Sequence, residues 1–449
     1  MAAPGSGCQA VGTRVGRRGV RGSGGVSTAD IERGGSWSAR SIYLLAILTL
    51  ISTLNYFDRS VMSLVLPLIK AEFKVKDTTL GAITSLILFY AVFGVPIAWL
   101  AERWSRRNVM AIGLSFWSLM TVLTGFAGGV GQLAVCRFLM GVGEGCGFAP
   151  AQSLVGDTFS RSGRALALSI LTTASSISLI VYSPIAGWVA GHYGWRATFF
   201  LAGAPGLVLA AVFMLTVKEP RHAATTTPRP SAPLGASLRF LLGSRAYVLC
   251  LLGTALMGVY LYGISAWGSM FFVRVRHLSI QEVGAYIQPT RGLMSAIGIV
   301  IGGVLASRLE LIDIRWRCWV AGLSCLILAP FEALYIFGGP TLLWAPAFVV
   351  AALFSIMHQG PIYSAYLGLA RPRMGAISVS VALLSATVIG QLGGPILIGR
   401  LNDVLHARFG EGAIRYSMLV VIGCAVLGGL CFLAAGRYIA ADTRRASEA

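Results

Sequence analysis

Twelve apolar runs, each long enough to cross a bilayer, constrain this chain more than any other feature. Short polar breaks separate the runs, and a spanning helix needs about 20 such residues. Period-two alternation is absent, which excludes a transmembrane barrel and predicts an all-α membrane protein. Only 12% of the residues are charged, against about 25% in soluble domains. The runs lie at about 42–66, 80–101, 108–127, 131–151, 165–190, 196–217, 246–272, 286–306, 317–337, 341–367, 375–399 and 415–436.

The 36 basic residues indicate an orientation rather than a nucleic-acid partner. With the N-terminus placed inside, 24 of them fall in inner segments, nine in outer loops and three within the runs. Cytoplasmic segments of membrane proteins carry this excess of Lys and Arg. The net charge of +19 therefore records topology and contact with anionic lipid. We expect both termini in the cytoplasm and no binding of nucleic acid.

The longest polar break divides the chain into two halves of six runs. Residues 218–245 contain TTTPRPSAP, and such Pro and Thr enrichment is typical of a flexible linker. The halves echo each other, since IAWLAERW at 97–104 resembles GVLASRLE at 303–310. We predict a disordered basic leader at 1–40, bundles at 41–217 and 246–440, a cytoplasmic linker at 218–245 and a cytoplasmic tail at 441–449.

Charged residues inside the runs are the strongest functional signal. The fourth run carries Arg137 and Glu144, which are seven residues apart and so share one face of a helix, about 10 Å apart along its axis. A charge near the hydrocarbon centre costs about 2.5–3.5 kcal/mol and needs a protein or water-filled surrounding. Glycines alternate from 141 to 147 and let a neighbouring backbone come close. We expect one tightly packed helix here.

The first run contains Asp58 and Arg59 about two-thirds of the way along. Counted from the outer ends of the two runs, Asp58 and Arg137 lie at similar depths, which favours an ion pair between the first and fourth helices. Glu144 would lie nearer the midplane. Asp58 and Arg59 would otherwise be a local charged pair at a loosely defined helix end.

Other polar residues are weaker indications of function, and most of them allow both a functional and a purely structural interpretation. The loop after the second run holds an acid and three bases, which form either a gate or ordinary stop-transfer charge: Glu102, Arg103, Arg106 and Arg107. Arg291 either snorkels to the interface or receives an anionic group. His358 is a core histidine or a cavity residue, beside a Gly360-Pro361 pair that should loosen the tenth helix. Tyr363 and Gln391 are candidate cavity-lining groups.

Motifs of enzymes and of metal or cofactor sites are missing from the sequence. GVGEG at 141–145 imitates part of a nucleotide-binding loop, but it follows no strand and sits inside a membrane run. The eight cysteines are scattered without metal-ligand spacing. We expect no catalytic residues, no cofactor and no metal.

Motifs in both halves resemble the major facilitator superfamily, and within it the bacterial spinster-like branch. The resemblance implies twelve transmembrane helices in two pseudo-symmetric six-helix bundles, the major facilitator fold. It covers about 40–440 and is more specific in the first half. The motifs are NYFDRSVMSLVLPLIKAEF, PIAWLAERWSRR, RFLMGVGEGCGFAPAQSLVGDTF, HYGWRATFFLAGAPGLVLA with KEP, DIRW, and IGQLGGPILIGRLND.

The resemblance also implies a function. It implies a secondary active transporter of the bacterial inner membrane that moves a small amphipathic or organic anionic solute, a lysolipid-like one included, by proton-coupled alternating access. Its partners would be the solute, protons and the bilayer, and we expect a monomer. An organic anion symporter of the anion–cation symporter type, which also has an Asp-Arg pair in its first helix, is the nearest alternative. Two further alternatives are an uncoupled lipid facilitator or flippase and a transporter-like receptor.

Carried over residue by residue, the resemblance places Asp58, Arg59, Arg137 and Glu144 on the family's buried charged set. The loop of Glu102 falls on its inner-loop gating motif, where the family's usual Asp is Glu102 and its usual glycines are Ala98 and Ser105. Asp58, Arg137 and Glu144 suit anions, zwitterions and amphipathic cations equally, so the residues leave the substrate, the direction and the coupling stoichiometry open.

Overall fold

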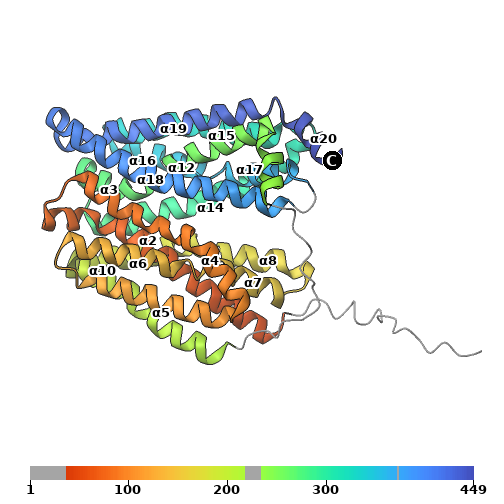
Figure 1. Ribbon diagram of the computed structural model, residues 1–449. Helices are drawn as coiled ribbons and strands as arrows, with labels where there is room; N and C mark the ends of the chain where they lie inside the picture. The colour runs from red at the N-terminus through yellow and green to blue at the C-terminus, as the bar shows by residue number, and fades with distance from the viewer. Residues whose placement is uncertain (1–36, 218–233, 372–373, 449) are drawn as a thin grey trace, which may run out of the picture.

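The computed structural model describes residues 37–217, 234–371 and 374–448, and these residues form helices joined by short turns. Figure 1 shows two helical bundles lying side by side. The first bundle contains α2 (Ala39–Phe73), α3 (Asp77–Ser85), η1 (Leu86–Leu88), α4 (Phe89–Arg103), α5 (Arg106–Gly125), α6 (Val130–Glu144), α7 (Phe148–Thr158), α8 (Arg161–Thr172), α9 (Ala174–Ile177), η2 (Ser178–Tyr182) and α10 (Ser183–Thr216).

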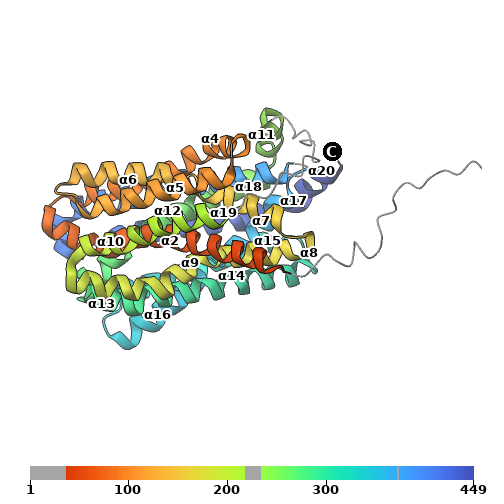
Figure 2. The same cartoon turned by 90° about the horizontal axis from the view of Figure 1, so that it is seen from below.

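The second bundle has the same kind of architecture. Figure 2, turned by 90°, shows the long helices of both bundles running along one common direction. The elements are α11 (Leu234–Leu242), α12 (Arg245–Arg276), α13 (Ile280–Glu282), η3 (Val283–Ile287), α14 (Gln288–Glu310), α15 (Trp316–Phe337), α16 (Thr341–Phe354), α17 (Gln359–Gly368), α18 (Gly375–Phe409), η4 (Gly410–Gly412), α19 (Ala413–Ala435) and α20 (Ile439–Glu448).

The long helices give the molecule two ends, which are named here by the segments that lie there. The start of α2 and the C-terminal helix α20 lie at one end, which we call the terminal end (Figure 1). The turn between α2 and α3 lies at the opposite end, which we call the distal end. Lys74 closes α2 there in the left-handed conformation, with φ of 49°.

The membrane-spanning segments of the described residues cover eleven of the twelve predicted runs. Nine segments of the described residues are long and apolar enough to cross a membrane. Two of them, Leu166–Thr216 and Gly375–Ala435, each contain two runs, because the chain turns back at Gly194 and at Gly410. Both glycines have positive φ, 81° and 55°, a backbone conformation that strongly favours glycine. The fourth run falls outside the nine because it is broken.

That break corrects the expectation of one helix over the fourth run. The run forms α6 and α7, with a turn at 145–147 between them. Glycine costs about 1 kcal/mol relative to alanine inside a helix, so the glycine-rich sequence weakens the helix at this point. The tenth run is also broken, between α16 and α17, beside the Gly360-Pro361 pair that predicted a loosened helix.

The glycines of α6 and of the turn that follows it do bring neighbouring backbones close, as their spacing predicted. A Cβ added at Gly141 would lie 3.1 Å from the carbonyl oxygen of Ile87. A Cβ at Gly145 would lie 3.1 Å from the carbonyl oxygen of Tyr90 in α4. Contact distances this short leave no room for a larger side chain. The helix that carries Glu144 is therefore fixed by its backbone against η1 and α4.

The segments outside the bundles are only partly described. Residues 1–36 of the predicted leader and 218–233 of the predicted linker lie outside the described residues. From residue 234 the predicted linker is helical, as α11. The tail forms α20, whose Asp442 Oδ2 accepts hydrogen bonds from the Ala246 N–H at 2.9 Å and the Ser244 hydroxyl at 2.7 Å. The tail thus caps α12, while the bundle boundaries at 41–217 and 246–440 stay predictions.

Replacing Gly141 by valine should destabilise the protein, and replacing Gly131 should not. Overpacking a tight contact costs about 1–3 kcal/mol, and the Gly141 contact is made by backbone. Nothing lies within 4 Å of a Cβ at Gly131, in the same helix. Thermal unfolding in detergent should show a lower midpoint for Gly141→Val than for Gly131→Val. Equal midpoints would contradict the close packing of α6.

Candidate functional site

An ion pair joins α2 and α6 inside the first bundle. Arg59 Nη2 lies 2.7 Å from Glu144 Oε2, and Arg59 Nε donates to the same oxygen at 2.9 Å. The Glu144 side chain is fully buried, whereas that of Arg59 is 24% exposed. Glu144 Oε1 has no hydrogen-bond partner among the described residues. The Arg59 side of the ion pair is thus accessible to a ligand or water, whereas the Glu144 side is enclosed by protein.

Asp58 and Arg137 do not form the ion pair that the sequence predicted. Arg137 Nη1 lies 3.4 Å from the backbone carbonyl oxygen of Asp58 instead, and its guanidinium stands over the ring of Phe199 at 4.6 Å. The Asp58 carboxylate accepts from the hydroxyl of Thr121 at 3.2 Å. The first and fourth runs are therefore linked by Arg59 and Glu144, while Asp58 and Arg137 meet through the backbone.

The length of α2 explains this difference. The helix continues through Pro67 to Phe73, seven residues beyond the predicted run. Arg59 therefore lies fourteen residues, about 21 Å, from the distal end of α2. Glu144 lies the same fourteen residues from the distal start of α6, but Arg137 only seven. Arg59 and Glu144 therefore lie at the same distance from the distal ends of their helices, which allows them to pair.

Aromatic rings surround the exposed side of Arg59. Its guanidinium lies 4.0 Å from the ring centre of Tyr90 and 5.8 Å from that of Tyr56, close enough for cation–π attraction. Tyr262 of the second bundle lies within electrostatic reach of Arg59 and Tyr90, and Tyr363 within reach of Tyr56 and Tyr90. The ion pair therefore faces the junction of the two bundles.

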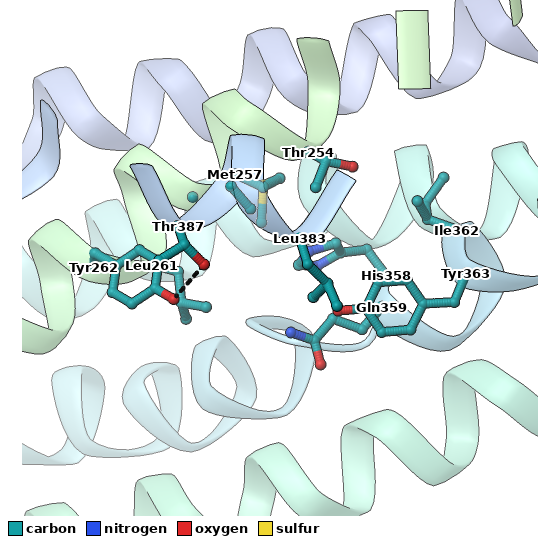
Figure 3. A pocket seen from close by; sticks show the side chains of 12 residues that line it. Thr254, Met257, Leu261, Tyr262, His358, Gln359, Ile362, Tyr363, Leu383 and Thr387 are labelled. Atoms are coloured by element: carbon teal, nitrogen blue, oxygen red, sulfur yellow. Dashed lines mark hydrogen bonds between the residues drawn. The ribbon is translucent and has the colours of Figure 1, made fainter. Parts of the chain in front are cut away.

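A cavity of about 80 Å³ opens in the second bundle beside these tyrosines (Figure 3). The Tyr262 hydroxyl lies 3.5 Å from that of Thr387 at one side of it. His358 is buried, its ring stacks on Phe432 at 6.1 Å, and its Nδ1 has no hydrogen-bond partner among the described residues. A mainly apolar wall with a few polar groups is typical of small-molecule sites. The cavity is lined by Thr254, Met257, Gly258, Leu261, Tyr262, His358, Gln359, Ile362, Tyr363, Leu383, Ala386 and Thr387.

Two of the four candidate cavity residues, His358 and Tyr363, line this cavity, and the other two lie elsewhere. Gln391 Nε2 donates to the backbone oxygen of Thr84 in the first bundle at 3.2 Å. Arg291 Nη2 lies 3.8 Å from Glu332 Oε1, which also accepts a hydrogen bond from the hydroxyl of Tyr260 at 2.5 Å. Arg291 thus joins α14, α15 and α12 inside the second bundle.

The predicted gating loop forms contacts within the first bundle. Arg106 Nη2 lies 2.6 Å from Asp157 Oδ2 in α7, and Arg107 Nη1 donates to the Val217 carbonyl oxygen at 3.2 Å. The side chain of Glu102 lies outside the described residues, and the gating roles of Arg103 and its neighbours stay predictions. Asp157 was not predicted, although it is the first acid after the fourth run, in the motif that ends GDTF.

No group of three or more His, Cys, Asp or Glu side chains within residues 37–217, 234–371 and 374–448 is arranged to hold a metal ion. The site described above consists of paired charges, hydroxyl groups and aromatic rings. Such groups bind, orient and exchange protons.

Two bundles of membrane-spanning helices with a buried charged site at their junction define a membrane transporter fold. The family model of the Major Facilitator Superfamily matches residues 48–390, and the chain belongs to this family. Within it, the chain falls in the spinster-like branch, as its motifs predicted. The family is one of membrane transporters.

The chain is similar to relatives of several kinds. It is 28% identical to an MFS-type efflux pump of Mycolicibacterium smegmatis, covering 92% of this chain and 96% of the pump. It is also 28% identical to protein spinster homolog 1 of Homo sapiens, covering 91% and 83%. Identity to the probable galactarate/D-glucarate transporter GudP of Bacillus subtilis is 26%, covering 62% and 67%.

A solved structure of a bacterial Spinster homologue is also similar to this chain. The crystal structure of a bacterial homologue of the human lysosomal transporter Spinster, in an inward-facing and unoccupied conformation, has a TM-score of 0.81 to this chain. Sequence identity is 25%, and the match covers 91% of this chain and 99% of that one.

Replacing Glu144 by leucine should cost more stability than replacing Glu144 and Arg59 together. Removing one partner of a buried pair costs about 3–5 kcal/mol, whereas an apolar replacement of both is often neutral. Because Arg59 is partly exposed, we expect the low end of that range. Thermal unfolding should show a lower midpoint for Glu144→Leu and recovery in the double variant.

Glu72→Leu serves as the control for this measurement. Glu72 pairs with Arg196 at 2.7 Å, with both side chains about 40% exposed, and exposed pairs contribute about 0–1 kcal/mol. A double variant less stable than Glu144→Leu would contradict the pairing of Arg59 with Glu144.

Proposed function

We propose that this protein is a secondary active transporter that moves a small amphipathic or organic anionic solute by alternating access, coupled to protons. The observation that carries the proposal is the Arg59–Glu144 pair, whose cation is partly exposed at the junction of the bundles. Its position gives an anionic group a binding partner at the junction of the two bundles. Alternating access is the mechanism expected of two bundles around one site.

Competition for Arg59 is the coupling step that we propose. A bound anion draws Arg59 away from Glu144, which leaves a fully buried carboxylate without its cation. An unpaired charge in such surroundings is expensive, so Glu144 takes up a proton. When the solute leaves, Arg59 returns to Glu144 and the proton is released. One proton thus accompanies one solute charge, and the site stays close to neutral throughout.

In the proposed cycle, Asp58 and Arg137 control how tightly α2 packs against α6. Asp58 Oδ1 and two nitrogens of Arg137 lack hydrogen-bond partners among the described residues. Polar atoms left without partners while buried mark a position that is stabilised only weakly as it stands. Protonation of Asp58 changes its attraction to Arg137, and this change loosens or tightens α2 against α6. We also propose that the charged loop of Glu102 and Arg103 is the gate that closes the inner side of the transport path.

The surroundings of Arg59 favour an amphipathic solute. The cation and the ring of Tyr90 accept a charged or polar head, and the neighbouring cavity offers apolar side chains such as Met257, Ile362 and Leu383. A lysolipid-like molecule has both parts.

An organic anion symporter is the alternative that a specific observation favours. The similarity to a probable galactarate/D-glucarate transporter supports a small polar acid as the solute. Such an acid would use Arg59 but not the apolar wall of the cavity. An uncoupled lipid facilitator or a receptor would bind solute without moving protons, so the assay below separates all of these.

The placement of the protein follows from its charge pattern. Basic residues gather in the segments at the terminal end, so we propose that this end faces the cytoplasm of a bacterium and the distal end faces outward. In this proposal the protein works as a monomer in the inner membrane, with no enzymatic activity, no cofactor and no nucleic-acid partner.

Proteoliposomes holding a pH-sensitive dye test the function. Lysolipids, organic acids and cationic drugs are added one at a time to the parent protein, to Glu144→Gln and to the control Glu310→Gln. Glu310 is a carboxyl at the end of α14 that pairs with Arg317. We expect a solute-dependent pH change in the parent and in Glu310→Gln, reduced at least tenfold in Glu144→Gln.

The other outcomes have distinct meanings. A pH change in Glu144→Gln equal to that of the parent would contradict its coupling role. Binding of a compound without proton movement in the parent would replace coupled transport by the facilitator or receptor. A response to small acids, but not to lysolipids, would favour the symporter.

A further inference from the structure

Several polar contacts join the two bundles in the distal part of the molecule. They come from Ser63 in α2 and from Asp77, Thr78 and Thr84 in α3. Asp77 and its neighbours lie at the distal end itself. The distal end is therefore held shut by specific contacts.

Asp77 is the centre of these contacts. Arg274 of α12 clasps its carboxylate with two bonds, Nη1 to Oδ2 at 2.7 Å and Nη2 to Oδ1 at 3.0 Å. Asn402 Nδ2 of α18 donates to Oδ2 at 2.9 Å. Asp77 is only 2% exposed, and paired bonds between Arg and a carboxylate are among the strongest polar contacts in proteins.

A second carboxylate crosses the junction in the opposite direction. Asp403 of α18 accepts from the backbone N–H groups of Asp77 at 3.0 Å and Thr78 at 2.8 Å, and from the Thr78 hydroxyl at 2.6 Å. The N-cap residue of α3, Lys76, makes no side-chain cap of its own. The free N–H groups at a helix start attract an anion. The second bundle therefore supplies the cap that α3 lacks.

The helices behind these carboxylates touch backbone to backbone. A Cβ at Gly81 would lie 2.4 Å from the Pro395 carbonyl oxygen, and one at Gly399 would lie 2.5 Å from that of Asp77. Gln391 continues the contact to Thr84. α3 and the distal part of α18 thus run antiparallel in a close seam, which positions the charged groups at its end.

Asp77 and Arg274 each also have a partner in their own bundle. Lys70 Nζ lies 2.5 Å from Asp77 Oδ1 within the first bundle, and Glu411 Oε2 lies 3.0 Å from Arg274 Nε within the second. If the bundles separate here, Asp77 keeps Lys70 and Arg274 keeps Glu411. Separation therefore leaves neither charge unpaired, which removes the main cost of breaking a buried pair.

We propose that Asp77, Arg274, Asn402 and Asp403 form a distal lock that closes one side of the transport path and opens once in each cycle. Lys70 and Glu411 are the reserve partners that make the opening reversible. This inference rests on the alternating access of the proposed function, but not on proton coupling or on the identity of the solute. It assigns closure of the distal end to contacts away from the Arg59–Glu144 site.

The lock and its reserve partners predict effects of opposite sign. Asp77→Asn and Arg274→Gln weaken only the closed state, so the open fraction should rise at least tenfold, which corresponds to about 1.4 kcal/mol. Lys70→Met and Glu411→Gln remove a partner that matters most after separation, so the open fraction should fall. Glu72→Gln is the matched control, because the partners of this distal acid among the described residues are Arg196 and Trp195 of its own bundle.

Distances between spin labels measure the open fraction in the full-length protein. Labels attached through an encoded non-canonical amino acid, which leaves the native cysteines in place, replace Tyr193 and Leu342 at the distal end. A second pair replaces Leu166 and Leu367 at the terminal end. All four side chains are more than half exposed. We expect Asp77→Asn to lengthen the distal distance and shorten the terminal one.

The distances also separate the failures. Unchanged distal distances in Asp77→Asn and Arg274→Gln would overturn the lock, as would an equal response to Glu72→Gln. A distal distance that lengthens while the terminal one stays fixed would mean local fraying of α3, and would overturn it too. A normal response of the lock in a protein whose Glu144→Gln variant still moves protons would contradict the coupling proposal alone.

Discussion

The membrane interior accepts a charge only when another group compensates it, and the Arg59–Glu144 pair shows how this structure meets that condition. The pair places α2 and α6 at a common depth, and the glycines of α6 let η1 and α4 close around the carboxylate. Arg59 keeps its other side at the junction of the bundles, among tyrosines from both. The same constraint that stabilises the first bundle thus prepares its site for an exchange of partners.

Exchange of partners recurs at the distal end with different residues. In the central site, solute and proton are proposed to compete for groups that are otherwise paired. In the distal lock, Asp77 and Arg274 hold each other, and each has a reserve partner in its own bundle. A charge that always has a second partner can move between two arrangements without a large barrier. In the proposed cycle, these two systems stabilise the two states of the carrier.

The sequence predicted the fold, and it placed Asp58, Arg59, Arg137 and Glu144 inside membrane-spanning runs, because apolar runs and intramembrane charges are local signals. It predicted the wrong partner for Arg137, because the end of α2 had to be placed by hydropathy, and the helix continues through seven further residues. The distal lock was not predicted, since Asp77 and Asp403 look like ordinary loop charges until α3 and α18 are placed together. Asp157, 51 residues from its partner Arg106, was missed for the same reason.

Infrared difference spectroscopy of solute binding tests the central claim most directly. The account predicts that binding of a transported anion produces the band of a protonated carboxyl group, and that this band is absent in Glu144→Gln and present in Asp58→Asn. A band that survives in Glu144→Gln, or no band in a parent protein that binds the anion, would contradict the exchange of Arg59 between Glu144 and the solute.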